Sequence, residues 1–344
     1  MPGHSQKCLL AQYLCLNQNP IFEMGSYLFM YSSRFCRLVS AFDVSFLFVI
    51  VVMMSTMAGL QKILICSDLD RTLIPNGFKK ESAHARPVFR RLAEHPNIHL
   101  AYVSGRDRKL ILDAIEEFYL PLPDYAIGDV GTTLYRVKND HWQLSEDWRD
   151  EIGKDWKGLS WEGLAEFFED MGDIRLQEPE KQTRYKLSFY TDQNIDHQRL
   201  INDIRLVLKQ KRVRANIIWS ADETGTSGLL DILPPRANKL HAIQFLMQQE
   251  QFSEDRTVFA GDSGNDLDVL TSGLQAILVK NAMAEVRKEA LKKLSPKHMM
   301  NRLYLPEGNF WGLNGNYAAG VIEGLVHFIP ETGGLIAEAV EKTR

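Results

Sequence analysis

The chain has 344 residues, 45% of them apolar, and a formal net charge of −4 at pH 7. This profile is ordinary for a globular protein, and the length allows two domains. Because a net negative chain without a dense Lys/Arg tract attracts phosphate backbones weakly, the composition argues against a dedicated nucleic-acid binder.

Residues 1–57 differ in character from the rest of the chain, and residues 44–60 carry no charge. A membrane-spanning helix needs about 20 apolar residues, so this run is borderline and a signal anchor stays open. The other interpretation is a leader outside the fold, or an upstream extension before a start at Met54 or Met57. We favour this second interpretation, and we therefore do not expect membrane contact.

The cysteines support no disulfide framework. Cys66 is the only cysteine after residue 57, and the other three lie in the leader: Cys8, Cys15 and Cys36. A single cysteine in the body of the chain suits a reducing compartment. We therefore expect a cytoplasmic protein.

From residue 61 onward, short apolar segments alternate with helical patterns. They predict strands at 62–67, 98–103, 256–261 and 274–279, and helices at 85–95, 107–118, 282–294 and from Leu267. Alternation of this kind favours a parallel sheet with helices on both faces. The expected fold is thus an α/β core with a Rossmann-like parallel sheet.

The middle of the chain has a different pattern of predicted helices and strands. It predicts helices at 160–171 and 196–210, and strands at 183–191, 213–220 and 228–234. This mixture indicates an α+β cap domain inserted at 139–235, between core segments 58–138 and 236–335. The pair Pro234-Pro235 marks the return to the core.

Polar side chains follow three of the predicted core strands. Asp68 and Asp70 follow the first strand, Ser104 the second, and the segment "GDSGND" a third. In open α/β sheets, ligands bind beyond the carboxyl ends of the strands. The convergence of these strand ends therefore predicts a reactive site.

The residue types suit phosphoryl transfer. Asp68 can act as a nucleophile, because carboxylates form aspartyl-phosphate intermediates. Asp262, with Asn265 and Asp266 nearby, supplies oxygen ligands of the kind that Mg²⁺ takes. Asp70 can then protonate the leaving alkoxide and later activate the attacking water.

Other groups can hold the phosphoryl oxygens. The hydroxyl of Ser104 and the backbone N–H of Gly105 lie at a loop where N–H groups are free. Lys239 opens a helix just after the insert and can balance the negative charge that develops.

Each motif alone also has a simpler interpretation. An Asp-x-Asp pair often caps a turn, a Ser-Gly pair often starts a helix, and an acidic glycine loop is often only a turn. Most lysines are solvated surface groups. The four motifs in this order, each at a strand end or helix start, favour the functional interpretation.

The segments "DLDRT", "SGR", "NK" and "GDSGND" resemble, in this order, the four motifs of the haloacid dehalogenase superfamily of phosphatases. The insert between the second and third motifs places the chain with members that carry a large α+β cap. Within that group it looks most similar to sucrose-6-phosphate phosphatases and to their relatives, the mannosylfructose-phosphate phosphatases. The similarity to these sugar-phosphate phosphatases rests on less specific segments than the four motifs, among them "PDYAIGDVGTTLY", "YKLSFY", "DILPPRANK" and "NYAAGVIEGLVHF".

The resemblance implies a role for each matching residue. Asp68 is the nucleophile and a Mg²⁺ ligand. Asp70 is the acid–base and also ligates Mg²⁺ through its backbone carbonyl. Ser104 and Lys239 hold the phosphoryl group, and Asp262 ligates Mg²⁺, with Asn265 and Asp266 completing or orienting its shell. The cap then supplies the sugar site, with Lys186 as first candidate and Gln177 and Glu178 behind it. For Lys186 an exposed strand lysine is the other interpretation, and for Gly131 a plain turn glycine.

The chain departs from the family at three positions. Arg71 stands where Asn or Gly is usual, Leu240 follows the motif lysine in place of a common glycine, and Ser104 replaces a Thr but keeps the hydroxyl. None of these removes a reacting group. A strand-like backbone at Arg71 directs its side chain away from the carboxylates, towards the cap or a nearby acid.

The resemblance implies a Mg²⁺-dependent phosphatase for sucrose 6-phosphate, with a sucrose-phosphate synthase as the candidate partner. A phosphatase for another disaccharide phosphate, such as mannosylfructose phosphate, is the first alternative. The second is a non-catalytic module that binds a sugar phosphate and docks to a synthase.

Overall fold

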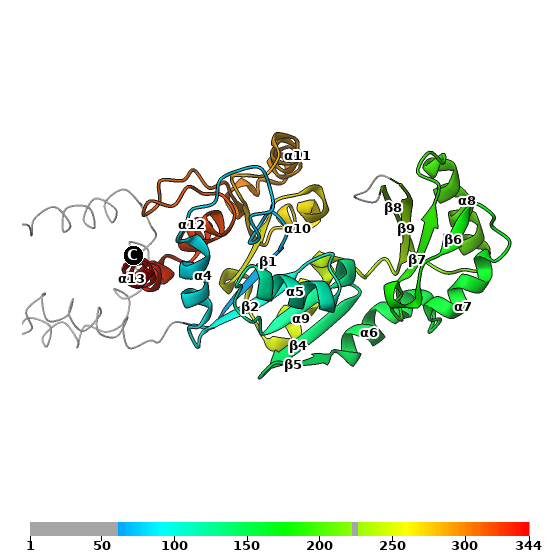
Figure 1. Ribbon diagram of the computed structural model, residues 1–344, viewed down its shortest axis with the longest axis horizontal. Coiled ribbons are helices and arrows are strands. Elements are labelled where there is room, and N and C mark those ends of the chain that lie inside the picture. Colours follow the sequence, from blue (N-terminus) through cyan, green and yellow to red (C-terminus); the bar gives the residue numbers. More distant parts are fainter. Residues whose placement is uncertain (1–60, 222–225, 344) are drawn as a thin grey trace, which may run out of the picture. The chain divides into compact units, whose positions relative to one another are not determined.

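The computed structural model describes residues 61–221 and 226–343, which form two β-sheets with flanking helices (Figure 1). The predicted leader, with its uncharged run at 44–60, lies outside the described residues. None of the helices in the described ranges combines the length and apolar character that a membrane span requires.

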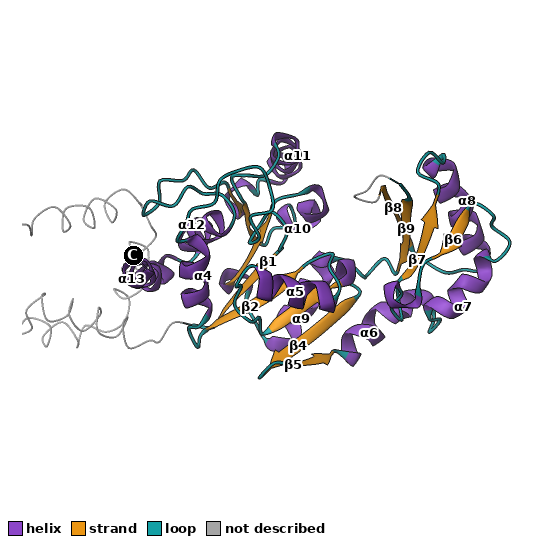
Figure 2. Cartoon of the chain, viewed as in Figure 1, coloured by secondary structure: helices purple, strands orange, loops and turns teal. Residues whose placement is uncertain are grey.

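Strands are drawn in orange in Figure 2, and the larger sheet, here the core sheet, has the strand order β12-β11-β10-β1-β2-β3-β4-β5. The strands from β12 to β3 are parallel, and β4 and β5 are antiparallel additions at one edge. Their bounds are β1 Ile63–Ser67, β2 Ile98–Val103, β3 Tyr125–Gly128, β4 Thr133–Lys138, β5 His141–Leu144, β10 Thr257–Gly261, β11 Gln275–Leu278 and β12 Leu303–Tyr304.

Side chains of the central strands alternate between two apolar layers, as the period of a strand requires. Ile63 and Ile65 of β1 pack into one layer, and Leu64 and Cys66 pack into the other. The first layer contains α4 (Ala85–Ala93), α12 (Ala318–Phe328) and α13 (Gly333–Thr343), and the second contains α9 (Lys239–Glu250), α10 (Leu267–Leu270) and α11 (Ala284–Leu294). Burial on both faces explains why β1 reads as a continuous apolar run.

The smaller sheet, here the cap sheet, is antiparallel with the order β6-β7-β9-β8. Its strands are β6 Ile174–Leu176, β7 Leu187–Thr191, β8 Asn216–Ala221 and β9 Gly228–Leu233, and the segment also holds α6 Glu146–Gly153, α7 Trp161–Ala165 and α8 His197–Gln210. Helix α8 buries Leu200, Ile204 and Leu208 at helical spacing and begins at the N-cap Asp196. An α/β core with an inserted α+β segment is thus the confirmed fold class.

Several elements differ in detail from the sequence-based expectation. β5 pairs with β4 in the core sheet, although we expect the cap from residue 139 onward. The predicted helix at 160–171 is the short α7 followed by a 3₁₀ turn at Glu166–Phe168, and the helix from Leu267 ends at Leu270. Residues beyond 335 belong to the core layer, since Ile336, Ala339 and Val340 of α13 are buried.

The register of the central strands fixes where the reactive residues lie. Ser67 of β1 is paired with Ala260 of β10 on one side and with Tyr102 of β2 on the other. The residues that follow these strands therefore emerge side by side at one edge of the sheet. The sequence convergence noted above is a direct result of this register.

Candidate active site

Asp68 is the first residue beyond β1 and is buried. Its backbone N–H donates to the Ala260 carbonyl at 2.9 Å, which continues the pairing with β10. The N–H of Leu69 donates to Asp68 Oδ1 at 2.7 Å, and Lys239 Nζ donates to Oδ2 at 2.9 Å. Burial raises the pKa of Asp68 to about 7, against the opposing charge of Lys239.

Lys239 is the first residue of α9, and its side chain is buried. Asn238 caps this helix, since its side chain accepts from the N–H of His241 at 2.9 Å. The ammonium donates to Asp68 and, at 2.7 Å, to Asp266 Oδ1. Burial alone lowers the pKa of a lysine, but these two carboxylates outweigh it and raise the pKa of Lys239.

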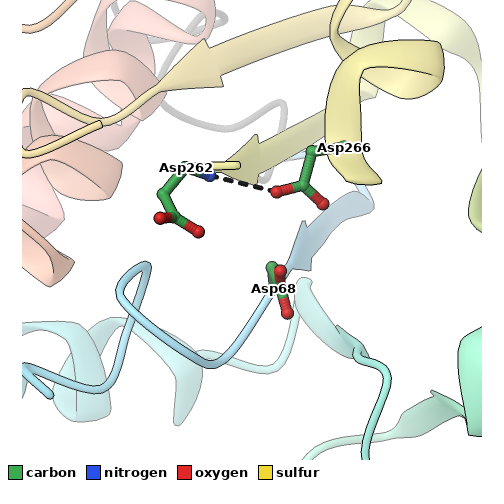
Figure 3. A group of neighbouring side chains, drawn as sticks. All are labelled: Asp68, Asp262 and Asp266. Atoms are coloured by element: carbon green, nitrogen blue, oxygen red, sulfur yellow. Dashed lines mark hydrogen bonds between the residues drawn. The ribbon is translucent and has the colours of Figure 1, made fainter. Parts of the chain in front are cut away.

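Asp262 and Asp266 come from the turn between β10 and α10, and both are buried. Asp266 Oδ2 accepts from the backbone N–H of Asp262 at 3.1 Å (Figure 3) and from that of Ser263, also at 3.1 Å, so Asp266 holds the turn in place. Asn265 is exposed, and its Oδ1 accepts from Ser263 Oγ at 2.8 Å. Asp266 therefore orients the turn that presents Asp262.

The carboxylates of Asp68, Asp262 and Asp266 fit a metal ion. Each offers an oxygen within 4.8 Å of the others, and Asp262 Oδ1 is buried without a hydrogen-bond partner among the described residues. Burial also raises the pKa of Asp262 to about 6, with the charge of Arg71 acting in the opposite direction. A cation held by these oxygens relieves both the missing contact and the excess of negative charge.

Asp70 lies two residues beyond Asp68 in quite different surroundings. Arg106 holds it through two parallel contacts, Nε to Oδ2 at 2.9 Å and Nη2 to Oδ1 at 2.7 Å, and Asn76 Nδ2 donates to Oδ1 at 2.7 Å. Burial opposes ionisation, but the hydrogen bonds and charge of Arg106 outweigh it, so the pKa of Asp70 is lowered. This arrangement keeps Asp70 ionised, whereas the first acid–base step expected of it needs a proton.

Ser104 and Gly105 follow β2 at the same sheet edge. The Ser104 side chain is buried, and its Oγ accepts from the N–H of Arg106 at 3.2 Å. Gly105 is exposed, and within the described part of the chain no atom beyond its two neighbours lies within 4 Å of the position that a Cβ would take. The loop thus leaves open space on the Cβ side of Gly105, where a ligand can approach the backbone.

Arg71 is not strand-like, contrary to our expectation, because its φ is 55°. This left-handed region favours glycine and asparagine, which is why a smaller residue suits the position. The side chain reaches a nearby acid, as expected, with Nε 3.1 Å from Asp262 Oδ2.

The three cap candidates lie in different places. Lys186 Nζ is 3.8 Å from Oδ1 of Asp129, a buried residue just after β3, so this lysine is not an exposed strand residue. Gln177 Nε2 donates to the Phe189 carbonyl at 2.9 Å, within the cap sheet. Glu178 is exposed and accepts from Tyr190 Oη at 2.8 Å.

Gly131 is more than a plain turn glycine. Its φ is 96°, and an added Cβ would lie 2.7 Å from the backbone carbon of Asn238. The turn after β3 thus packs directly on the N-cap residue of α9, which precedes Lys239. Leu240, the other departure noted above, is partly buried among apolar residues of the second layer.

Three residues near the site, Arg106, Asn76 and Asp129, have no functional role among the predictions from the sequence. Arg106 completes the quoted "SGR" motif, so its position was visible, but only the fold shows that it faces Asp70. Asn76 and Asp129 carry no local signal beyond the turns in which they lie.

Known proteins resemble the chain over most of its length. Residues 61–329 match the family model described as sucrose-6F-phosphate phosphohydrolase. A putative HAD-like hydrolase of Nitrosococcus oceani is 59% identical over 272 residues, which cover 79% of this chain and 73% of that protein. The mannosylfructose-phosphate phosphatase of Agrobacterium fabrum is 30% identical over 77% of this chain and 96% of its own length.

A solved structure shows the same fold. The sucrose-phosphatase of Synechocystis, determined with sucrose and phosphate, aligns with a TM-score of 0.57 and 24% identity, over 78% of this chain and 99% of that one. The family match and the Agrobacterium fabrum relative confirm both the predicted superfamily and the predicted enzyme class. The chain belongs to the sucrose-6F-phosphate phosphohydrolase family, a group of phosphoric monoester hydrolases in the haloacid dehalogenase superfamily.

Proposed function

We propose that this phosphatase is Mg²⁺-dependent and hydrolyses sucrose 6-phosphate to sucrose and phosphate. The observation that carries the proposal is the buried group of Asp68, Lys239, Asp262 and Asp266 at the carboxyl edge of a parallel sheet, in a chain of this family. A buried nucleophile, one buried cation and two further carboxylates suit the transfer of a dianionic group better than any other chemistry of these residues.

In the first step, a carboxylate oxygen of Asp68 attacks phosphorus and the ester P–O bond breaks. The leaving alkoxide takes a proton from Asp70, and an aspartyl phosphate forms. In the second step, Asp70 accepts a proton from water, the water oxygen attacks phosphorus, and phosphate leaves while Asp68 is restored.

The surrounding groups position and neutralise the phosphoryl oxygens. Lys239, the Ser104 hydroxyl and the Gly105 N–H offer donors at the sheet edge where Asp68 emerges. Asp68, Asp262 and the Asp70 carbonyl would hold Mg²⁺, which supplies positive charge to the phosphoryl group; Asn265 and Asp266 complete or orient this shell.

The ionised state of Asp70 suits the second step directly. For the first step it needs a proton, and a substrate phosphate competes with Asp70 for the guanidinium of Arg106. Loss of that partner leaves burial as the main influence, which favours the protonated carboxyl. Arrival of the substrate thus prepares Asp70 to act as an acid.

The sugar site is proposed in the cap. Lys186 is the leading residue, because it lies beside Asp129 of the core, and Gln177 and Glu178 are the further candidates. Mannosylfructose phosphate is the alternative substrate, and the Agrobacterium fabrum relative supports it. A sucrose-phosphate synthase partner and a cytoplasmic location stay predictions from the sequence, as does the absence of nucleic-acid binding.

The test is phosphate release from sucrose 6-phosphate, mannosylfructose phosphate and monosaccharide phosphates, with Mg²⁺ or with chelator. We expect Mg²⁺-dependent turnover, highest for sucrose 6-phosphate, and a loss of more than roughly a hundredfold in Asp68→Asn. The exposed acid Asp268 supplies the matched control, Asp268→Asn, which should retain activity. Turnover that survives chelation, or sugar-phosphate binding without turnover, would contradict the proposal.

A further inference from the structure

Arg71 contacts a carboxylate of the candidate metal site, although the family usually has Asn or Gly at this position. Its Nε lies 3.1 Å from Asp262 Oδ2, and its side chain is 48% exposed while that of Asp262 is 4% exposed. A surface guanidinium therefore reaches down to a buried acid. The other oxygen of that acid, Oδ1, has no hydrogen-bond partner among the described residues.

The backbone of Arg71 is held in its left-handed conformation from two sides. Its N–H donates to Asn76 Oδ1 at 2.8 Å, and its carbonyl accepts from Asn281 Nδ2 at 2.6 Å. Asn281 is fixed in turn, because its Oδ1 accepts from the N–H of Tyr317 at 2.7 Å. These contacts fix the backbone from which the Arg71 side chain extends to Asp262.

The charges at the site are shared unequally. The Lys239 ammonium lies 2.9 Å from Asp68 and 2.7 Å from Asp266. Among the described residues, Arg71 is the cation in contact with Asp262. A divalent cation on Asp262 meets this guanidinium in two ways. It competes with Arg71 for Oδ2, and it is repelled by a like charge a few ångströms away.

We infer that Arg71 weakens the binding of the divalent cation and so sets the concentration at which the site fills. The inference rests on the proposed metal site at Asp262. A neutral residue at position 71 leaves Asp262 Oδ2 free for the ion and removes the repulsion. The arginine thus makes occupancy of the site depend on the cation concentration around it.

The experiment measures Mg²⁺ affinity by calorimetric titration of the full chain, with the Mg²⁺-induced rise in Tm as a second readout. Two variants separate charge from backbone strain. Arg71→Gln removes the charge but keeps a long side chain at positive φ, whereas Arg71→Asn removes the charge and fits that backbone. We expect Kd for Mg²⁺ to fall roughly fivefold in both variants.

The matched control removes an arginine from another ion pair. Arg136→Gln, whose partner is Glu250 on α9, should leave Kd within about twofold of the parent value. Asp262→Asn should abolish binding, which ties the measured event to this site. A tighter Kd in Arg71→Asn alone would assign the effect to strain and overturn the inference.

The outcomes distinguish this inference from the proposed function. If the parent binds Mg²⁺ and turns over substrate, but Arg71→Gln and Arg71→Asn bind no more tightly, the inference fails and the proposed function stands. If the parent binds no Mg²⁺ and turnover survives chelation, both fail.

Discussion

At the scale of single residues, the carboxylates of Asp68 and Asp70 have pKa values shifted in opposite directions. Burial raises the pKa of Asp68 to about 7, whereas Arg106 more than offsets burial at Asp70 and lowers its pKa. The difference arises from partners distant in sequence, Lys239 for one and Arg106 for the other. Two carboxylates separated by one residue thus acquire different proton affinities from their environments.

Arg106→Met removes the partner of Asp70 and keeps a side chain of similar length. Burial then acts with less opposition, so the pKa of Asp70 should rise. The limb of the pH profile of kcat/KM that belongs to Asp70 should move to higher pH. Arg106→Lys keeps a positive charge and should move that limb less, and an unmoved limb in Arg106→Met would show that Arg106 does not control this titration.

At the scale of elements, the start of α9 positions the buried lysine. Asn238 caps the helix and also donates Nδ2 to the Pro235 carbonyl at 3.0 Å, so it joins the returning chain to the first turn of α9. Gly131 packs against the same residue from the turn after β3. The position of Lys239 therefore depends on two neighbours that do not touch the substrate site.

Asn238→Ala should cost about 1 kcal/mol of unfolding free energy, because the N-cap hydrogen bond is lost. It should also lower kcat/KM by roughly tenfold, since Lys239 then lies less accurately beside Asp68. The matched control is Asp196→Ala, which removes the N-cap of α8 in the cap. Urea unfolding and steady-state kinetics should show a similar stability loss in both variants and a loss of turnover in Asn238→Ala alone.

Gly131→Ala should destabilise the protein more than Gly158→Ala. Both glycines have positive φ, 96° and 83°, so either alanine is strained by about 1 kcal/mol. Of these two positions, only an added Cβ at 131 meets backbone, that of Asn238; at position 158 no atom of the other described residues, chain neighbours apart, lies within 4 Å of the added Cβ. We expect an additional loss of about 1–2 kcal/mol at position 131 in chemical denaturation; equal losses would exclude crowding.

The sequence predicts the parts of this protein that follow local rules. The strand ends at Asp68, Ser104 and Asp262 were predictable, because apolar runs mark buried parallel strands and their carboxyl ends share one edge. The pairing of Arg106 with Asp70 and the left-handed backbone of Arg71 depend on tertiary contacts that no local pattern encodes. The β4–β5 hairpin was missed because its strands have one exposed side and lack the continuous apolar run of the central strands.

At the scale of the whole molecule, the site concentrates negative charge in the interior. Asp68, Asp262 and Asp266 are all buried; one buried lysine contacts Asp68 and Asp266, and the partly exposed Arg71 contacts Asp262. Proteins hold such groups at a cost in stability unless a cation or proton compensates. If a cation binds this site, as proposed, the folding stability should depend on pH, and the cation should reduce that dependence.

The stability of the protein in chelator should fall as pH rises from 5 to 8. The folded pKa values of Asp68 and Asp262, about 7 and about 6, lie above the unfolded value near 4. Within this window the folded state holds protons that the unfolded state has lost, so each rise in pH favours unfolding. Asp70 has the opposite sign, but its lowered pKa places that effect below the window.

Urea unfolding at pH 5 and pH 8 should show a difference of roughly 2–4 kcal/mol in chelator, and a smaller one in saturating Mg²⁺, which binds the ionised carboxylates of the folded state. Asp262→Asn should reduce the difference in chelator and should abolish the gain from Mg²⁺, because it removes a titrating group and a ligand together. Asp268→Asn, on the exposed side of α10, should change neither. Equal stability at both pH values would mean that these carboxylates ionise as freely in the folded chain as in water.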